Sequence, residues 1–306
     1  MKKVLVFEGI TQSVVTYLES NHIEVIINKQ QEVSDFTDYP DVDGMILMMH
    51  PVADAIMSKL PQLKIIARFG VGYDNVNLED ASAHHIVVTN TPGANATAVA
   101  ETAVMHMLMA GRAFYQQRQS ITETLGNVPI SQEITNKTIG IIGFGAIGQK
   151  IDELLTGFNV NVLAYARHDK LVKNGHMATL EEIYTESDFI VLALPSTPKT
   201  YHMINADVFE KMKTNAVLVN IARGSVVDEQ ALITALKLGT IAGAGLDVVE
   251  NEPIASNNEL LALPNVFVTP HVAAKSREAF DKVGLVAAQE VVRVLNNEAP
   301  HFKVND

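Results

Sequence analysis

The sequence of 306 residues contains no cysteine. Disulfide bonds and thiol catalysis are therefore excluded, and the absence fits a reducing compartment. Long apolar runs are also missing, since none approaches the roughly 18 residues of a membrane-spanning helix. The apolar start, Val4 to Phe7, ends at Glu8 and Gly9, which favours a first β-strand over a signal peptide. We therefore expect a soluble, cytoplasmic protein.

Basic residues are in the minority, with 23 Lys and Arg against 35 Asp and Glu and a formal net charge of −12. A nucleic-acid-binding protein needs a basic face to neutralise phosphates, and none is visible, so no nucleic-acid partner is expected. Apolar residues, by contrast, make up 47% of the chain. The length and this share predict a globular protein with about two domains, each with its own core.

The first 95 residues alternate between patterns of strand and helix type. Helical spacing appears, for example, at Ser13–Glu19 and Val52–Leu60. Five short apolar runs read as buried strands: Val4–Phe7, Val25–Ile27, Met45–Met48, Leu63–Ala67 and Ile86–Val88. This alternation predicts a parallel sheet covered by helices on both faces.

The rest of the chain repeats the alternation after a predicted helix from Ala96 to about Arg118 and a polar connection at 123–137. Six further strands are predicted: Thr138–Ile142, Val160–Ala166, Phe189–Leu194, Val217–Ile221, Gly243–Val248 and Val266–Thr269. Six strands complete one doubly wound domain, so the last predicted helix, Ser276 to about Asn296, should return to the first.

The predicted fold is α/β, with two Rossmann-like doubly wound parallel-sheet domains and an interdomain cleft. Residues 1–95 plus 276–306 would form one discontinuous domain. Residues 96–275 would form the other, which includes the interdomain helix 96–118.

One stretch joins a strand, a glycine turn, a helix and a second strand: Thr138–Ile142, the glycines of residues 143–148, a helical pattern up to Phe158, and Val160–Ala166. In a dinucleotide site Gly143 permits the tight turn, Gly145 lets the pyrophosphate approach the backbone, and Gly148 lets the helix pack on the strand. The N–H groups at the helix start, at Ala146 and Ile147, would hold the phosphates. An ordinary glycine-rich turn is the alternative, and the surrounding pattern favours the nicotinamide-dinucleotide site. Residues 96–275 are therefore the expected dinucleotide-binding domain, and residues 1–95 plus 276–306 the expected substrate (catalytic) domain.

Three predicted strands of the second domain end near polar side chains: Arg223, Glu252 and His271. Ligands of open parallel sheets bind outside the carboxyl ends of the strands. Arg223 can hold a substrate carboxylate and polarise a carbonyl, while His271 can donate and remove a proton. Glu252 can fix the imidazole tautomer and favour its protonated form. Singly, these residues could be a surface ion-pair partner, a solvated turn residue and a capping residue; their joint placement indicates hydride transfer to a 2-oxo acid.

A series of motifs, in order along nearly the whole chain, resembles the D-isomer-specific 2-hydroxy acid dehydrogenase family, and within it the phosphoglycerate dehydrogenase-like branch. The motifs are residues 67–76 (ARFGVGYDNV), 90–101 (NTPGANATAVAE), 143–148 (GFGAIG), 194–200 (LPSTPKT), 219–224 (VNIARG), 245–253 (GLDVVENEP) and 269–271 (TPH). Such an ordered series is highly specific.

The resemblance implies an NAD(P)-dependent dehydrogenase in which Arg223, Glu252 and His271 form the catalytic trio. The N–H groups of Val71 and Gly72 would help to hold the substrate carboxylate. Asp247 would bond the nicotinamide amide. Further cofactor contacts are expected at Ala166, Arg167, Pro195, Thr200, Ile221, Ala222 and Ala273. No metal is implied, and the family's dimers, built around the helix 96–118, suggest a homodimer.

The sequence departs from the dinucleotide fingerprint where an acidic residue should bind the ribose 2′-hydroxyl. Tyr165 is followed by Ala166, Arg167 and His168, with no acid before Asp169. A missing carboxylate beside an arginine suits a 2′-phosphate. We therefore favour NADP(H), or dual use, over strict NAD(H); alternatively Arg167 points to solvent and NAD(H) binds without the acid.

The substrate loop departs from the phosphoglycerate dehydrogenases, which carry an Arg-Ser pair for the substrate phosphate where this chain has Met48-Met49-His50-Pro51. An apolar wall disfavours a phosphate, because burying the unpaired charge is unfavourable. We therefore expect a small 2-oxo acid such as glyoxylate or hydroxypyruvate, or a branched oxo acid. The alternatives are D-3-phosphoglycerate dehydrogenase and, less favoured, a dinucleotide-sensing corepressor.

Overall fold

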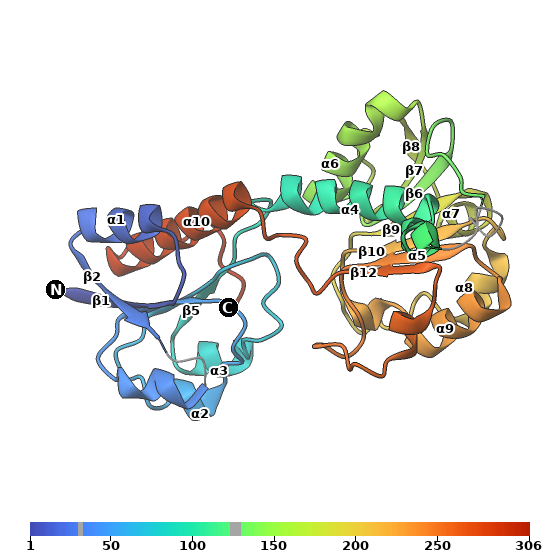
Figure 1. The fold of residues 1–306 in the computed structure, drawn as a ribbon. Coiled ribbons are helices and arrows are strands. Elements are labelled where there is room, and N and C mark those ends of the chain that lie inside the picture. Colours follow the sequence, from blue (N-terminus) through green and yellow to red (C-terminus); the bar gives the residue numbers. More distant parts are fainter. Residues whose placement is uncertain (30–32, 123–129) are drawn as a thin grey trace. The chain divides into compact units, whose positions relative to one another are not determined.

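The computed structural model describes residues 1–29, 33–122 and 130–306, so residues 123–129 of the expected polar connection lie outside the described residues. The chain forms two compact units, one of residues 1–95 and 275–306 and the other of residues 96–274 (Figure 1). Each unit contains one parallel β-sheet with helices on both faces. The predicted α/β class with two parallel-sheet domains is confirmed.

The first unit contains a five-stranded sheet in the order β2-β1-β3-β4-β5. Its elements are β1 (Lys2–Phe7), α1 (Gln12–Ser20), β2 (Ile23–Asn28), the 3-10 helix η1 (Val33–Asp38), β3 (Gly44–Leu47), α2 (Asp54–Met57), β4 (Ile65–Arg68), α3 (Leu78–Ala83), β5 (Val87–Thr89) and α10 (Arg277–Leu295). Helices α1 and α10 lie side by side on one face of this sheet, and α2 and α3 cover the other (Figure 1). All strand pairs are parallel.

Alternate side chains of each strand enter different cores, which explains the continuous apolar runs. On β1, Val4 and Val6 pack with the α1–α10 layer, whereas Leu5 packs with the α2–α3 layer. A strand covered on both faces gains from an apolar side chain at every position.

The second unit contains a seven-stranded parallel sheet in the order β12-β11-β10-β9-β6-β7-β8. Its strands are β6 (Thr138–Ile142), β7 (Asn161–Tyr165), β8 (Gly175–Met177), β9 (Phe189–Leu192), β10 (Val217–Asn220), β11 (Gly243–Leu246) and β12 (Val266–Val268). The order reverses at β6, which pairs with both β7 and β9. This switch point is where open α/β sheets bind their ligands.

Helices cover both faces of this second sheet. The helices of this unit are α4 (Ala96–Gly111), α5 (Phe114–Gln119), α6 (Ala146–Leu155), α7 (Leu180–Glu186), α8 (Ala206–Lys211) and α9 (Glu229–Leu238), with the 3-10 helices η2 (Ser120–Thr122), η4 (Thr156–Phe158), η5 (Gly224–Val226) and η6 (Glu259–Ala262). Helices α4 and α6 share one core, and α7, α8 and α9 share the other (Figure 1). Helix α4 also contacts β10, β11 and β12.

Three expectations about single elements are wrong. The seventh strand, β8, was not expected. The helix expected at 96–118 is interrupted after α4, because Ala113 adopts a left-handed conformation with φ 48° and α5 starts anew. The helix expected at Val52–Leu60 is reduced to α2, since Val52 forms an isolated bridge with Val76.

Among the described residues, no helix is both long and apolar enough to cross a membrane.

Candidate active site

The three glycines of the turn between β6 and α6 differ in the space that a side chain would find there. Gly143 has a φ of +102°, and a Cβ there would lie 2.4 Å from the carbonyl oxygen of Ala193. A Cβ at Gly148 would lie 2.5 Å from the carbonyl oxygen of Gly143, so this glycine allows the helix to pack on the strand end. Among the residues that the structure describes, a Cβ at Gly145 would have no neighbour within 4 Å. The first and third glycines are thus required by the fold itself, whereas the second leaves open space.

The amino end of α6 is free to receive an anion. Gly145 is its N-cap residue, and no side chain of the described residues caps the helix. Gly145 and Ala146 are exposed and Ile147 is half-buried. Uncapped N–H groups and the positive end of the helix dipole attract phosphate. These features fit the pyrophosphate of a dinucleotide.

The end of β7 lies beside this turn, because the carbonyl oxygen of Tyr165 accepts hydrogen bonds from the N–H groups of Gly143 and Phe144. Ala166 is half-buried and the Arg167 side chain is exposed. A hollow of about 430 Å³ opens here, lined by Tyr165, Ala166, Asp169, Met177, Ala178, Thr179, Leu180 and Glu182. Asp169 thus offers a carboxylate at this edge of the sheet.

His271 and Glu252 form a pair at the carboxyl edge of the seven-stranded sheet. The imidazole Nδ1 lies 2.7 Å from Glu252 Oε2, and Glu252 Oε1 accepts a hydrogen bond of 3.2 Å from the Val249 N–H. Both side chains keep about a third of their surface exposed. The pair therefore remains accessible to a ligand, with Nε2 as the nitrogen that Glu252 does not hold.

Arg223 lies close enough to this pair to affect its charge. Burial raises the pKa of Glu252, but the hydrogen bond from His271, the charge of that imidazole, the Val249 N–H and the charge of Arg223 together hold the pKa below its usual value. Arg223 Nη1 also donates to the Ala222 carbonyl at 2.8 Å. A cation, a carboxylate and an imidazole thus follow β10, β11 and β12 at one edge of the sheet.

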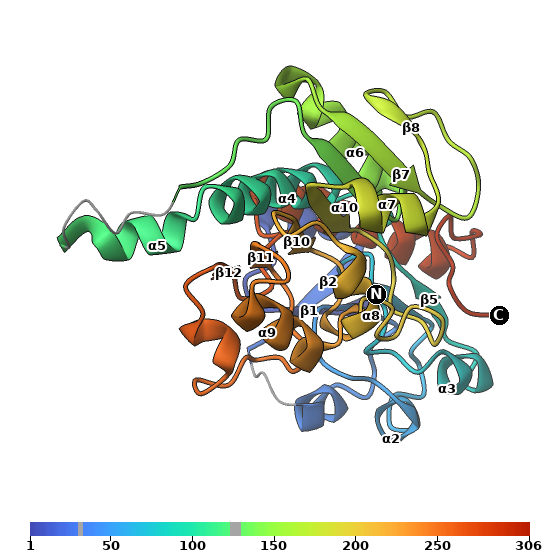
Figure 2. The same cartoon turned by 90° about the vertical axis from the view of Figure 1, so that its right-hand side faces the viewer.

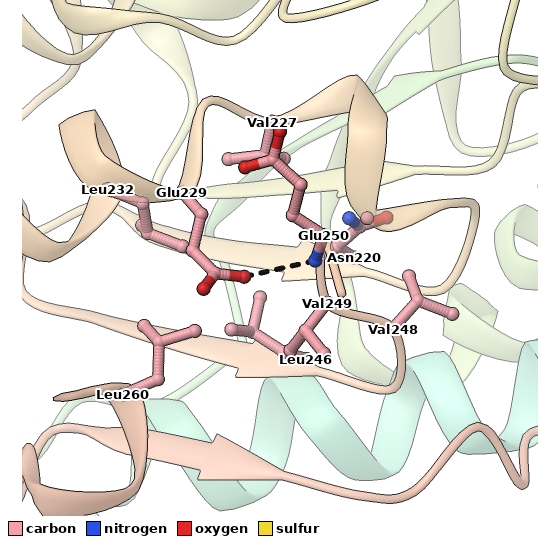
Figure 3. A pocket seen from close by; sticks show the side chains of 10 residues that line it. Asn220, Val227, Glu229, Leu232, Leu246, Val248, Val249, Glu250 and Leu260 are labelled. Carbon is pink, nitrogen blue, oxygen red and sulfur yellow. Dashed lines mark hydrogen bonds between the residues drawn. The ribbon is translucent and has the colours of Figure 1, made fainter. Parts of the chain in front are cut away.

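A buried carboxylate, that of Glu229, accepts a hydrogen bond from the loop that carries Glu252. Glu229, at the start of α9, accepts a hydrogen bond from the Glu250 N–H at 3.0 Å (Figure 3). It also accepts one from Asn258 Nδ2 at 2.8 Å. The Glu250 side chain in turn lies 2.8 Å from His202 Nε2, on the loop after β9. These contacts position the loop after β11 and were not predicted from the sequence.

Asp247, which follows β11 directly, is buried and binds the loop that carries His271. Its carboxylate accepts hydrogen bonds from Thr269 Oγ1 at 2.6 Å, the Val272 N–H at 2.9 Å and the Ala273 N–H at 2.8 Å. A carboxylate has about four acceptor positions, so one is left for a further donor such as an amide.

The other expected cofactor contacts lie in loops at the carboxyl ends of neighbouring strands. Thr200 Oγ1 donates to the Pro195 carbonyl at 2.8 Å in the loop after β9. Ile221 and Ala222 are buried directly after β10, and Ala273 is buried after β12. Among the described residues, no group of three or more His, Cys, Asp or Glu side chains could hold a metal ion.

In the first unit, the expected substrate residues Val71 and Gly72 lie in the loop after β4. Both are half-buried, and among the described residues neither N–H group donates a hydrogen bond to the backbone. The Val71 carbonyl accepts from Asn90 Nδ2 at 2.7 Å, which fixes the loop. These N–H groups are therefore suited to bind an anion.

A buried cation, Arg68, lies next to this loop, and no role for it was predicted from the sequence. Its Nε donates to Asn75 Oδ1 at 2.9 Å, and its Nη2 lies 3.8 Å from Met49 Sδ. Asn75 Nδ2 donates to the His50 carbonyl at 2.8 Å. The wall at residues 48–51 is therefore less apolar than the sequence indicated. The sequence feature that could have indicated a role for Arg68 is its position as a charged residue at the end of an otherwise apolar strand.

Comparison with known proteins gives a consistent result. Residues 104–273 match the family model described as D-isomer specific 2-hydroxyacid dehydrogenase, NAD binding domain. The glyoxylate reductase of Pyrococcus furiosus is 37% identical, and the match covers 99% of this chain and 95% of the relative.

Two solved structures share the fold over almost their full length. The NADPH-dependent glyoxylate/hydroxypyruvate reductase of Sinorhizobium meliloti, in complex with NADP and malonate, has a TM-score of 0.84 at 32% identity and covers 99% of this chain and 96% of its own. The NAD+-bound 3-phosphoglycerate dehydrogenase of Entamoeba histolytica has a TM-score of 0.87 at 26% identity, with 100% and 99% coverage.

Proposed function

The chain belongs to the D-isomer specific 2-hydroxyacid dehydrogenase family, and we propose that it interconverts a small 2-oxo acid, glyoxylate or hydroxypyruvate, with the D-2-hydroxy acid. It is an NAD(P)-dependent oxidoreductase of 2-hydroxy acids, as predicted. The observation that carries the residue roles is the 2.7 Å contact of His271 with Glu252, close to Arg223 at the carboxyl edge of the sheet.

In the proposed mechanism C2 of the oxo acid receives a hydride, which a bound reduced nicotinamide would supply. His271 Nδ1 is held by Glu252, so Nε2 is the nitrogen that gives its proton to the carbonyl oxygen, and in reverse it removes the hydroxyl proton. Arg223 binds the substrate carboxylate and polarises the carbonyl. One hydride and one proton convert the carbonyl into the hydroxyl group.

The remaining roles are also proposals. Val71 and Gly72 would donate their N–H groups to the substrate carboxylate. Asp247 would accept from the nicotinamide amide with its remaining lone pair. Gly143–Gly148 would hold the pyrophosphate, which the uncapped start of α6 and the open side of Gly145 support.

The relatives support the choice of a small unphosphorylated acid. Several curated relatives with 35–40% identity are glyoxylate reductases, and the S. meliloti structure is a glyoxylate/hydroxypyruvate reductase. The second candidate substrate is 3-phosphoglycerate, favoured by the buried cation Arg68 beside the Val71 loop.

For the cofactor we propose NADP(H) or dual use. The exposed Arg167 at the end of β7, with no acid before Asp169, suits a 2′-phosphate. Asp169 in the neighbouring hollow is the carboxylate that a strict NAD(H) enzyme could use instead.

The test is the initial rate of NADPH and NADH oxidation with glyoxylate, hydroxypyruvate, pyruvate, 2-oxoisocaproate and 3-phosphohydroxypyruvate. We expect the highest kcat/KM with an unphosphorylated acid and NADPH, and loss of turnover in His271→Ala. A preference of orders of magnitude for 3-phosphohydroxypyruvate would select the second candidate. At least tenfold better kcat/KM with NADH would reject the NADP preference, and no turnover of any acid would favour a dinucleotide-sensing role.

We also propose a homodimer, in the cytoplasm where reduced nicotinamide is available to the reaction. Exposed apolar side chains on α4, α5 and η2 support the dimer: Met105, Leu108, Phe114, Tyr115 and Ile121. Contiguous exposed apolar side chains are typical of protein–protein interfaces.

A further inference from the structure

The catalytic histidine proposed above sits in a short loop, residues 269–273, that wraps around Asp247. Three successive N–H groups of this loop donate to that one residue. The His271 N–H donates to the Asp247 carbonyl at 2.8 Å, while the Val272 and Ala273 N–H groups donate to its carboxylate. His271 has a φ of 51°, an uncommon conformation for a non-glycine residue that the surroundings must hold in place.

The Asp247 carboxylate is itself oriented through Thr269 by a histidine on α4. Thr269 Oγ1 donates its only hydrogen to Asp247 at 2.6 Å, so toward His106 Nε2, 2.9 Å away, it can only accept. His106 must therefore carry its proton on Nε2. Its Nδ1 is buried and has no hydrogen-bond partner among the described residues, which fits a neutral ring.

The packing around His106 maintains this tautomer. The side chain is fully buried, and burial lowers the pKa of His106 to about 4 against the opposing effect of Asp247. A Cβ at Gly245 on β11 would lie 2.9 Å from His106 Cβ, so the glycine makes room for the ring. Protonation would place an N–H at Nδ1 with no acceptor, which is unfavourable in a buried site.

A second side chain of α4 contacts the same loop. Thr102 lies four residues before His106, on the same face of the helix, and its Oγ1 donates to the Ala273 carbonyl at 3.3 Å. Both ends of the loop are thus attached to α4, Thr269 through His106 and Ala273 through Thr102.

We propose that His106 is a positioning residue for the reaction: through Thr269 it fixes the Asp247 carboxylate, which holds the loop and so sets the direction of the His271 ring. The inference rests on the proposed catalytic role of His271. His106 contacts neither substrate nor cofactor in this role, and it acts as a neutral hydrogen-bond donor.

The experiment compares His106→Leu, which removes the donor, with His106→Gln, whose amide N–H can replace Nε2. We expect His106→Leu to lower kcat about tenfold with KM for the oxo acid within threefold, because the displaced ring disturbs the reacting geometry more than binding. His106→Gln should restore kcat to within threefold of the wild type. Thr269→Val should resemble His106→Leu, and the double variant should be no worse than either, since both break one chain of contacts.

A second readout needs no cofactor or substrate. Hydrogen exchange of the apo protein should quicken at least tenfold at the Val272 and Ala273 amides in His106→Leu, but not in the control Met107→Leu, a buried residue on the same helix. Wild-type kcat and unchanged exchange in His106→Leu, or independent, multiplying effects of the His106 and Thr269 changes, would overturn the proposal. Lack of turnover by the wild type would instead overturn the proposed function and leave the exchange test valid.

Discussion

At the scale of single residues, the site depends on side chains that orient one another. Glu252 holds one nitrogen of His271, and the Val249 N–H holds Glu252. A ring held in this way presents its other nitrogen in a fixed direction, which proton transfer requires. The role of each residue can therefore be tested by changes that keep shape and remove one property.

Glu252→Gln keeps the shape and removes the charge. We expect kcat to fall about 100-fold at neutral pH with KM within threefold, because the amide no longer stabilises the imidazolium or selects its tautomer. A kcat within threefold of the wild type would mean that Glu252 is an ordinary solvated turn residue. Steady-state kinetics with the best oxo acid measure both parameters.

The same variant should also change how protein stability depends on pH in the acid range. The pKa of Glu252 is lowered in the folded protein, so its contribution to stability is complete above the unfolded-state pKa and is lost as the pH falls through the folded-state value. Tm measured as a function of pH in the acid range should therefore fall less steeply in Glu252→Gln than in the wild type. An identical slope would show that the carboxylate is not stabilised by folding.

The residues that could be predicted from the sequence were those in loops after strands. Arg223 and His271 interrupt apolar runs, so they were visible as polar residues where none was needed for the core. Arg68 and His106 were not assigned, because one ends a strand and the other lies within an apolar helix. Their roles depend on partners distant in sequence, such as Thr269 for His106.

At the scale of elements, the β6–α6 turn separates what the fold needs from what a ligand needs. A Cβ at Gly148 would lie 2.5 Å from the carbonyl oxygen of Gly143, whereas a Cβ at Gly145 would lie within 4 Å of none of the described residues. The same Gly-to-Ala change should therefore lower stability at Gly148 and weaken dinucleotide binding at Gly145.

We expect Gly148→Ala to lower the free energy of unfolding by about 1–3 kcal/mol, since the helix must move off the strand. Gly145→Ala should leave Tm within about 2 °C but weaken NADPH binding at least tenfold, because the added methyl occupies the side that the pyrophosphate approaches. Thermal unfolding and calorimetric titration of both variants provide the comparison. Unchanged affinity in Gly145→Ala would mean that the dinucleotide does not approach this glycine.

Elements with a full apolar run were predictable, and those held by distant contacts were not. The predicted strands appear within a few residues of their expected ends. Strand β8 was not predicted because its residues, 175–177, form no apolar run. It is held by distant contacts instead: the Asp152 carboxylate accepts hydrogen bonds from the turn before it, and a Cβ at Gly175 would lie 1.9 Å from the Val162 carbonyl oxygen. The interruption of the helix at Ala113 could not be predicted either, because alanine is a good helix former and its identity does not indicate a break.

At the scale of the whole molecule, each unit closes its own core, and the apolar surface that is left exposed needs another explanation. Helix α5 projects from the seven-stranded unit (Figure 2). Phe114 and Tyr115 on α5 and Ile121 on η2 are 42%, 39% and 77% exposed. Such a protruding apolar segment is unfavourable in a monomer and favourable at an interface between two copies.

We therefore expect the wild type to migrate in light-scattering chromatography at twice the chain mass of 33.3 kDa. Phe114→Glu combined with Ile121→Glu should give the single-chain mass, because each chain would bury two charges without partners in the dimer. Leu238→Glu on α9 is the matched control, since Leu238 is as exposed as Ile121 at 77% but lies on another surface, and it should keep the wild-type mass. A monomeric wild type would contradict the proposed dimer, and a dimer that survives the double change would place the interface elsewhere than on α5 and η2.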